Sequence, residues 1–318
     1  MTSAYLFAGQ GAQKAGMGKD LYEHSEIFRK VFDDAALDFD LKRMCFEDPD
    51  GKLIETQYTQ PCLTAMEVGI TEILREAGLR PDYTAGLSLG EYSALEAAGV
   101  LTAEETIEMT AFRGKAMAEA AKGIECGMTA VLGLSEATLQ TCCSEASDEG
   151  VVSICNYNCP GQLVIGGEKK AVDRAADYAV EAGARRCIPL QVSGPFHTAF
   201  MAPAGKKLEA YFADTVFRPA QSIVMYNCLG GENTTGAPVG DLLVKQVQSS
   251  VYMEQILRNM FAAGVTEFVE IGPGKTLSGF VRKTAKAVGT DNYRTWNLDS
   301  FESVTEYIES LKEALKGA

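Results

Sequence analysis

Hydrophobic positions recur along this chain with two periods, and the two periods predict alternating strands and helices. Short apolar runs that are typical of buried strands lie at residues 5–7, 223–226 and 267–271. The spacing of a helix is found at residues 20–36, 63–77 and 197–214. Thr102 and Glu105 have the T-x-x-E form of a capping box, which predicts a long helix from there to about Ala121. Strands that alternate with helices favour a parallel sheet covered on both faces.

A different order of elements begins near residue 125. The pattern predicts strands at residues 128–132, 151–155, 162–165 and 184–190. It predicts helices at 135–146 and 169–181, and a turn at 156–161. Strand-helix-strand-strand-helix-strand is the order of ferredoxin-like units. We therefore expect residues 125–191 to form an inserted subdomain, and residues 1–124 and 192–318 to form the main α/β domain.

Composition narrows the class of protein. The 318 residues are 46% hydrophobic, which is enough for one large domain with an insert. A net charge of −14 without a long basic run argues against nucleic acid and anionic membranes as ligands. No apolar run reaches the roughly 20 residues of a membrane span, and the chain begins with a strand instead of a basic leader. We expect a cytoplasmic protein.

The cysteines and histidines give no metal pattern. The nine cysteines are an odd count and are scattered over several elements, so we expect free thiols in a reducing compartment. With only two histidines and no C-x-x-C pair, we expect no metal site.

Two glycine-rich segments fall short of nucleotide-binding patterns. Residues 9–18 begin like G-x-G-x-x-G, but Lys14 stands where the third glycine is required. Residues 272–276 end like a phosphate-binding loop, but Val269 stands where the first glycine is required. The sequence therefore gives no support for a nucleotide cofactor.

The stretch Gly86-Leu87-Ser88-Leu89-Gly90 has the form G-x-S-x-G. It lies between a predicted strand at 83–85 and a predicted helix at 91–98. A serine on such a sharp turn is held in a strained backbone conformation, and its hydroxyl projects at a helix N-terminus that favours negative charge. This context predicts that Ser88 is an acyl-transfer nucleophile. The alternative is a tight turn whose serine caps the helix.

A serine nucleophile needs a base, and the chain offers two histidines. His24 falls inside a predicted helix between polar residues, which is typical of a surface position. His197 follows Gly194-Pro195-Phe196 in a loop after a predicted strand, where the sites of parallel sheets gather. We therefore expect His197 to be the base, the alternative being a histidine satisfied at the start of a helix.

Arg113 lies on a largely apolar helix beside Phe112, Ala116 and Met117. An arginine in such surroundings must extend to water or meet a carboxylate. Spacing leaves two interpretations open, namely an internal ion pair or a fork for a substrate carboxylate.

Six segments then point to a family. They are FAGQGAQ at 7–13, GLSLGEYSAL at 86–95, FRGK at 112–115, NYNCPGQ at 156–162, GPFH at 194–197 and EIGPGK at 270–275. In this order they resemble malonyl-CoA:acyl-carrier-protein transacylase, over nearly the whole length. The resemblance implies a hydrolase-like parallel-sheet core with a ferredoxin-like insert. It also implies malonyl-CoA and acyl carrier protein as substrates, and no cofactor.

The resemblance also implies roles for individual residues. Ser88 would be the nucleophile and His197 the general base and acid, oriented by the backbone carbonyl of Gln246. The oxyanion hole would consist of the backbone N–H groups of Gln10 and Leu89.

Three further residues would bind the substrate. Arg113 would pair with the malonyl carboxylate, Phe196 would close the pocket beside the acyl carbon, and Asn158 would contribute to the same site. Two positions depart from the family. Leu87 replaces a common histidine, and Ser249-Ser250-Val251-Tyr252-Met253 replaces an N-P-V-x-W segment, which leaves the packing around Gln246 less defined.

Carrier proteins are usually acidic, so an acidic chain needs a local basic patch to bind one. The candidates are Lys169, Lys170, Arg185, Arg186, Lys283 and Lys286. We expect the chain to act as a monomer.

Several alternatives remain at this level. An acyltransferase serving polyketide synthesis fits the same motifs. A serine esterase or thioesterase fits less well, because a neutral ester needs no guanidinium such as that of Arg113. A carrier-binding module without catalysis fits poorly, because it has no use for Ser88 and His197.

Overall fold

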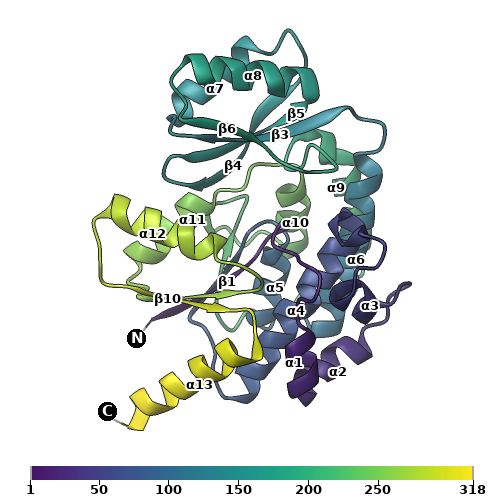
Figure 1. The fold of residues 1–318 in the computed structure, drawn as a ribbon, viewed down its shortest axis with the longest axis vertical. Coiled ribbons are helices and arrows are strands. Elements are labelled where there is room, and N and C mark those ends of the chain that lie inside the picture. Colours follow the sequence, from purple (N-terminus) through teal and green to yellow (C-terminus); the bar gives the residue numbers. More distant parts are fainter. Residues whose placement is uncertain (1, 317–318) are drawn as a thin grey trace.

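The computed structural model describes residues 2–316, which form two β-sheets with surrounding helices (Figure 1). The larger sheet has the strand order β10-β9-β1-β2-β7-β8, and all its neighbouring pairs are parallel except β7 and β8. Its strands are β1 (Ser3–Phe7), β2 (Tyr83–Gly86), β7 (Ile223–Tyr226), β8 (Gly231–Glu232), β9 (Glu267–Ile271) and β10 (Arg294–Leu298). The predicted parallel sheet is therefore confirmed.

Helices cover this sheet on both faces. They are α1 (Lys19–His24), α2 (Glu26–Asp34), α3 (Leu41–Phe46), α4 (Thr56–Glu76), α5 (Gly90–Ala97), α6 (Ala103–Ala120), α9 (Ala202–Phe212), α10 (Val239–Val247), α11 (Met253–Ala262), α12 (Thr276–Val288) and α13 (Phe301–Lys316). Two short 3₁₀ turns lie at Lys52–Ile54 and Ala199–Met201.

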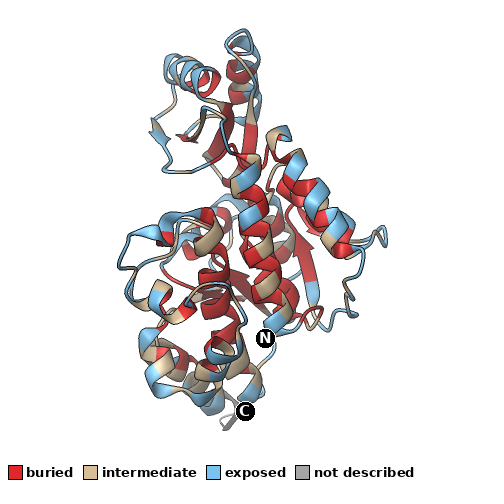
Figure 2. Ribbon diagram, turned by 90° about the vertical axis from the view of Figure 1, so that its right-hand side faces the viewer, coloured by how far each residue is buried: buried red, intermediate tan, exposed pale blue. Residues whose placement is uncertain are grey.

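The side chains of β1 show the two faces. Tyr5 and Phe7 are buried in one core with Met66 of α4, whereas the alternate residue Leu6 is buried in another with Val281 of α12. Figure 2 shows the strands buried inside, while the outer faces of the helices are exposed. Both faces of the larger sheet are therefore buried, as the apolar runs predicted.

The smaller sheet lies above the larger one in Figure 1 and is antiparallel. Its order is β4-β5-β3-β6, the order of a ferredoxin-like unit. Its strands are β3 (Cys126–Leu132), β4 (Val152–Cys159), β5 (Gln162–Glu168) and β6 (Arg186–Pro189), and its helices are α7 (Glu136–Glu145) and α8 (Lys169–Glu181). Val131 and Ile165 pack against the two helices. The predicted ferredoxin-like order is confirmed.

The other face of the smaller sheet packs on the main body of the protein. Met128 and Val164 share a core with Met117 of α6 and with Phe196. Backbone bonds add a second connection, because Tyr157 N–H donates to the Val251 carbonyl at 2.8 Å and Val251 N–H donates to the Cys155 carbonyl at 2.9 Å. The edge of β4 is thus paired with a loop of the main body.

Several predicted boundaries were wrong for local reasons. The helix expected at 20–36 is two helices, because Ser25 accepts the N–H of Phe28 and caps α2. Helix α4 begins at Thr56 and contains Pro61, so the start expected at Leu63 was too late.

Two more boundaries differ around the cleft. The turn expected at 156–161 is shorter, because β4 continues through Cys159 and leaves Pro160 and Gly161 at the bend. The helix expected from His197 starts only after the 3₁₀ turn at Ala199–Met201, so His197 lies in the preceding loop.

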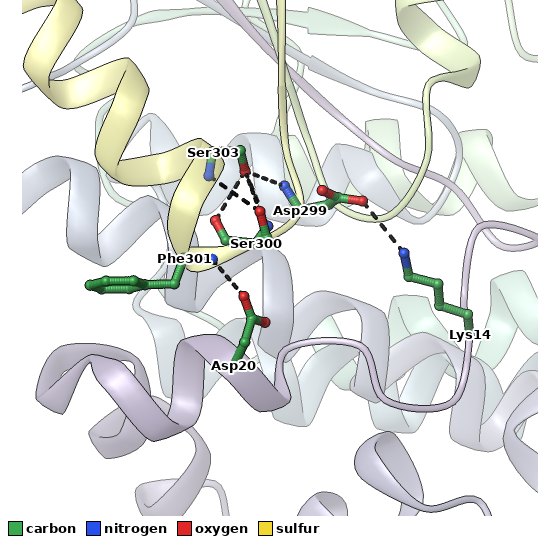
Figure 3. A network of polar contacts seen from close by, with 6 residues as sticks. All are labelled: Lys14, Asp20, Asp299, Ser300, Phe301 and Ser303. Atoms are coloured by element: carbon green, nitrogen blue, oxygen red, sulfur yellow. Dashed lines mark hydrogen bonds and ion pairs between the residues drawn. The ribbon is translucent and has the colours of Figure 1, made fainter.

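The last helix is fixed to the first segments of the chain (Figure 3). The N–H of Phe301 donates to the carboxylate of Asp20 at 2.7 Å, and the Asp299 carboxylate lies 3.5 Å from the Lys14 ammonium. Ser300 and Ser303 bond each other across the first turn of α13. A carboxylate at a helix N-terminus stabilises it, so α1 caps α13. None of the described helices combines the length and apolar character needed to cross a membrane.

Candidate active site

The turn between β2 and α5 brings the chain back on itself so closely that only glycine fits at two positions. A Cβ at Gly86 would lie 1.8 Å from the carbonyl carbon of Gly90, and a Cβ at Gly90 would lie 2.3 Å from the carbonyl oxygen of Phe7. Ser88 at the apex has φ +55°, in the left-handed region that non-glycine residues rarely occupy. The glycines of the motif therefore permit the turn, and the turn holds Ser88 in a strained conformation.

His197 lies directly at the serine hydroxyl. Its Nε2 is 2.6 Å from Ser88 Oγ, and its Nδ1 is 2.9 Å from the backbone carbonyl oxygen of Gln246. Because a carbonyl can only accept, Nδ1 carries the proton in the neutral ring, and Nε2 is free to accept the Ser88 hydroxyl proton. His197 also has a positive φ of 61°. Among the described non-glycine residues, only Asp48, Ser88 and His197 do.

The histidine is buried and stays uncharged at neutral pH. The pKa of His197 is lowered to about 4, chiefly by burial and then by the positive charge of Arg113, while the Gln246 carbonyl acts in the opposite direction. A neutral imidazole in contact with a hydroxyl is the protonation state that a general base requires.

Arg113 is fully buried and has no carboxylate partner within salt-bridge distance in the described part of the chain. Its Nη1 donates to Gln60 Oε1 at 2.9 Å, and its Nη2 donates to Gln246 Oε1 at 3.0 Å and to Ser88 Oγ at 3.2 Å. The guanidinium also lies 5.2 Å from the ring centroid of Tyr92.

Of the two interpretations of Arg113 that the sequence left open, the structure therefore does not support the internal ion pair. A buried guanidinium held only by neutral groups is available to an incoming anion, and it lies beside the reacting hydroxyl.

A cleft of about 210 Å³ opens at Ser88 and His197, between the two sheets. Three of the residues expected at the substrate, Gln10, Asn158 and Phe196, line it. The Oδ1 of Asn158 is buried without a hydrogen-bond partner. The remaining walls are mostly apolar and are formed by Leu87, Met117, Met128, Val164, Leu190, Val192 and Phe280.

The N–H groups of Gln10, which lines the cleft, and of Leu89, which follows Ser88, have no acceptor in the described residues. The N–H of Ser88 itself is taken, because it donates to Asn227 Oδ1 at 2.7 Å. The Gln10 side chain donates to Thr56 Oγ1 at 2.9 Å, which ties the glycine-rich loop to the start of α4. These contacts are compatible with the oxyanion role expected for Gln10 and Leu89, which stays a prediction.

Three side-chain amides at the site were missed by sequence reasoning. Asn227 follows β7 and donates to the Gly86 carbonyl at 2.7 Å as well as accepting from Ser88. Gln246 was expected only for its backbone, but its Nε2 also donates to the Ser88 carbonyl at 2.7 Å. Gln60 lies in the first turns of α4, before the start expected at Leu63. No local pattern marks an amide for such contacts.

The residues that the sequence assigned no role at the site were also placed as expected. His24 is exposed at the end of α1 and stacks on Phe301. All nine cysteines are free thiols. Within residues 2–316 no group of three or more His, Cys, Asp or Glu side chains could hold a metal ion.

The chain belongs to the acyl transferase family, because the model of the acyl transferase domain matches residues 4–313. The relatives to which it is similar are malonyl CoA-acyl carrier protein transacylases. That of Bacillus subtilis is 39% identical over 313 residues, which are 98% of this chain and 97% of the relative. The family expected from the six motifs is confirmed.

Solved structures agree. The malonyl CoA-acyl carrier protein transacylase of Clostridium perfringens is 38% identical and matches with a TM-score of 0.92 over 99% of this chain and 98% of that one. A malonyl-transacylase in complex with a type II PKS acyl-carrier protein is 34% identical, with a TM-score of 0.92 over 98% of this chain and 100% of that one. The α/β fold class with a smaller antiparallel sheet is thereby confirmed.

Proposed function

We propose that this chain transfers the malonyl group from malonyl-CoA to the phosphopantetheine thiol of acyl carrier protein, through a malonyl ester on Ser88. The observation that carries the proposal is the contact of Ser88 Oγ with His197 Nε2 beside the unpaired guanidinium of Arg113. The names of the relatives support the same substrates. Fatty acid synthesis is the process in which we place it.

In the first half-reaction Ser88 Oγ attacks the thioester carbonyl while its proton passes to His197 Nε2. The tetrahedral oxyanion rests on the N–H groups of Gln10 and Leu89, and loss of one such donor typically costs on the order of 10²–10³ in rate. The C–S bond then breaks, and the imidazolium returns the proton to the leaving thiolate of coenzyme A. Throughout both steps, the hydrogen bond from His197 Nδ1 to the Gln246 carbonyl keeps the ring in place.

The second half-reaction runs the same steps in reverse with a new thiol. His197 takes the proton of the phosphopantetheine thiol, the sulfur attacks the malonyl ester, and Ser88 leaves with the proton. The apolar walls of the cleft support this reading, because water competing for the ester would make the enzyme a hydrolase.

Substrate selection falls to the buried arginine. The malonyl carboxylate replaces neutral partners of Arg113 with a charge-assisted pair, Phe196 closes the pocket beside the acyl carbon, and Asn158 binds along the cleft. The chemistry needs only acids, bases and hydrogen-bond donors, so we propose that it requires no cofactor.

The candidate surface for the carrier protein lies at the entrance of the cleft. Lys283 on α12 donates to Gln162 at 3.1 Å, and Gln162 lines the cleft, so this end of the candidate basic patch lies near the substrate entrance. We also propose a monomeric protein in the cytoplasm, and a division into residues 125–191 and the remainder as two domains.

The test is intact-mass measurement after mixing with malonyl-CoA. The wild type gains one malonyl group, and peptide mapping finds it on Ser88. Ser88→Ala abolishes the adduct while the circular dichroism spectrum is retained. Ser93→Ala, at a serine on α5, is the matched control and keeps the adduct. An adduct of the same size on the alanine variant of Ser88 would overturn the assignment.

A role in polyketide synthesis is the second candidate. It is favoured by the similar malonyl-transacylase that was solved with a type II PKS acyl-carrier protein. Transfer rates from the malonyl enzyme to carrier proteins of the two pathways, measured side by side, separate the two candidates.

A further inference from the structure

On the edge that faces β7, backbone pairing of strand β2 stops a few residues before Ser88. β2 pairs with β7 only at Tyr83 with Ile223 and at Thr84 with Val224. Beyond these rungs β2 and β7 are no longer paired, although β7 pairs with β8 on its other edge. On the opposite edge the ladder continues, because Leu87 N–H donates to the Phe7 carbonyl at 3.0 Å.

The side chain of Asn227 takes the place of the missing backbone. In a parallel ladder a peptide on one strand donates to residue i−1 and accepts from residue i+1 of the next strand. Asn227 Nδ2 donates to the Gly86 carbonyl at 2.7 Å, and its Oδ1 accepts from Ser88 N–H at 2.7 Å. The amide therefore makes a parallel rung about Leu87 with a side chain, and it extends the sheet to the nucleophile.

Asn227 is itself fixed at every polar atom. Its N–H donates to Glu91 Oε2 at 2.5 Å, its carbonyl accepts from Tyr252 N–H at 3.0 Å, and it is fully buried. Glu91 lies on α5 three residues after Ser88, so the contacts close a ring from Ser88 through Asn227 back to the helix that follows the serine. A ring of this kind leaves the turn little freedom to relax.

We propose that Asn227 is a positioning residue for the acyl-transfer reaction, holding the strained turn so that Ser88 Oγ meets His197 and the N–H of Leu89 stays free for the oxyanion. By occupying the N–H of Ser88, it also determines which amide of the turn is available. The readout with malonyl-CoA rests on the proposed function.

Three variants test this. Asn227→Ala removes both contacts. Asn227→Asp keeps an acceptor for Ser88 N–H, but it can donate to the Gly86 carbonyl only while the introduced carboxyl is protonated. Asn259→Ala is the matched control, because Asn259 Nδ2 makes the same kind of bond to the Gly230 carbonyl at 2.9 Å, in the loop after Asn227 and away from the serine.

We expect the rate of Ser88 malonylation to fall about 10- to 100-fold in Asn227→Ala, the scale of one or two lost hydrogen bonds to the reacting turn. KM for malonyl-CoA changes little, since Arg113 is untouched. Asn259→Ala retains the wild-type rate. A purely structural role would instead lower the melting temperature of both variants with no selective loss of rate.

Asn227→Asp gives a readout in pH. Its malonylation rate rises toward that of the wild type as pH falls and the introduced carboxyl takes up a proton. The wild-type kcat/KM stays level down to about pH 5, because the pKa of His197 in the free enzyme lies near 4. The titratable groups beside the position are Glu91, whose pKa burial raises to about 8, and Cys228, whose pKa burial raises to about 12, and both stay mostly protonated below pH 7.

A fluorophosphonate that labels reactive serines separates the two proposals. If the wild type reacts with this reagent and not with malonyl-CoA, the proposed function fails while the labelling rates of the variants still test Asn227. Wild-type malonylation and labelling rates in Asn227→Ala would overturn the positioning role, and so would a pH-independent rate in Asn227→Asp. The aspartate variant, which preserves the shape of the side chain, carries the test if the alanine variant does not fold.

Discussion

The Nη2 atom of Arg113 lies 3.2 Å from the Oγ atom of Ser88, so a buried cation and the candidate nucleophile share one end of the cleft. The other guanidinium contacts are to the neutral side chains of Gln60 and Gln246. A substrate whose acyl group ends in a carboxylate can place its carbonyl carbon at Ser88 and its charge at Arg113. An acyl group without that charge leaves the guanidinium unpaired.

Arg113→Ala therefore tests selectivity. Removing one partner of a buried ion pair costs about 3–5 kcal/mol, so kcat/KM for malonyl-CoA should fall on the order of 10²–10⁴-fold. Acetyl-CoA presents no charge, and its transfer should fall far less. Arg113→Lys should restore only part of the malonyl activity, because an ammonium cannot form the fork. Equal losses with both thioesters would make Arg113 structural and would favour the esterase alternative.

The pH dependence should reveal the coupling between Arg113 and His197. The pKa of His197 is lowered to about 4, so kcat/KM, which reports the free enzyme, should stay level down to about pH 5 and decline below about pH 4. When the malonyl carboxylate neutralises Arg113, one cause of that lowering disappears. The acid limb of kcat should therefore lie at higher pH than the limb of kcat/KM. Identical limbs would contradict the coupling.

His197→Ala should slow malonylation of Ser88 by about 10²–10⁴-fold, the range typical of a lost general base. The matched control is His24→Ala, which removes the only other histidine, an exposed one at the end of α1. Stopped-flow release of coenzyme A measures both. A wild-type rate in the His197 variant would mean that another group accepts the serine proton.

Leu87→His introduces the residue that is common in the family. The side chain of Leu87 lines the cleft, and it packs so near the glycine-rich loop that a Cβ at Gly9 would lie 3.1 Å from its Cγ. An apolar side chain takes no part in the hydrogen bonds that Ser88 makes with His197 and with Arg113. We expect malonyl transfer to change less than about threefold, which is under 1 kcal/mol. A larger change in kcat would show that position 87 acts on the nucleophile.

Glu91→Gln should flatten the pH dependence of stability. Burial raises the pKa of Glu91 to about 8, against the opposing effects of the Asn227 N–H and the Arg113 charge. Because the folded state then holds a proton that the unfolded state releases above about pH 4.5, the free energy of unfolding declines as pH rises from there toward 8. Glutamine carries no proton to lose. Urea denaturation at pH 5 and pH 8 should show a smaller difference in the variant than in the wild type, and equal differences would argue against the shift.

The sequence predicted those parts of the site that depend on neighbours in the chain. Ser88 sits in a strand-turn-helix unit whose glycines and flanking apolar run are all local, and His197 was the remaining histidine. The strained backbone of Ser88 was expected from this turn, whereas the positive φ of His197 has no such signal in the neighbouring sequence.

Asn227 and Gln60 escaped prediction for different reasons. Asn227 reaches Ser88 because β7 is the spatial neighbour of β2, although more than a hundred residues separate them, and local patterns do not give strand order. Gln60 was missed because the helix was expected to begin only at Leu63, three residues later. In the structure Pro61 lies in the second turn of α4, where its missing N–H removes a single bond of the ladder. The side-chain role of Gln246 has no sequence signature at all.

The pairing of β4 with Val251 has a mechanical consequence. β4 carries Asn156 and Asn158 on one wall of the cleft, and the same strand is hydrogen-bonded through Tyr157 and Cys155 to a loop of the opposite body. A hinge that opened the cleft at this point would have to break these two backbone bonds, so they oppose separation of the two walls. Widening the cleft for a bulkier acyl chain would cost these bonds, which favours acyl chains that fit the cleft as it stands.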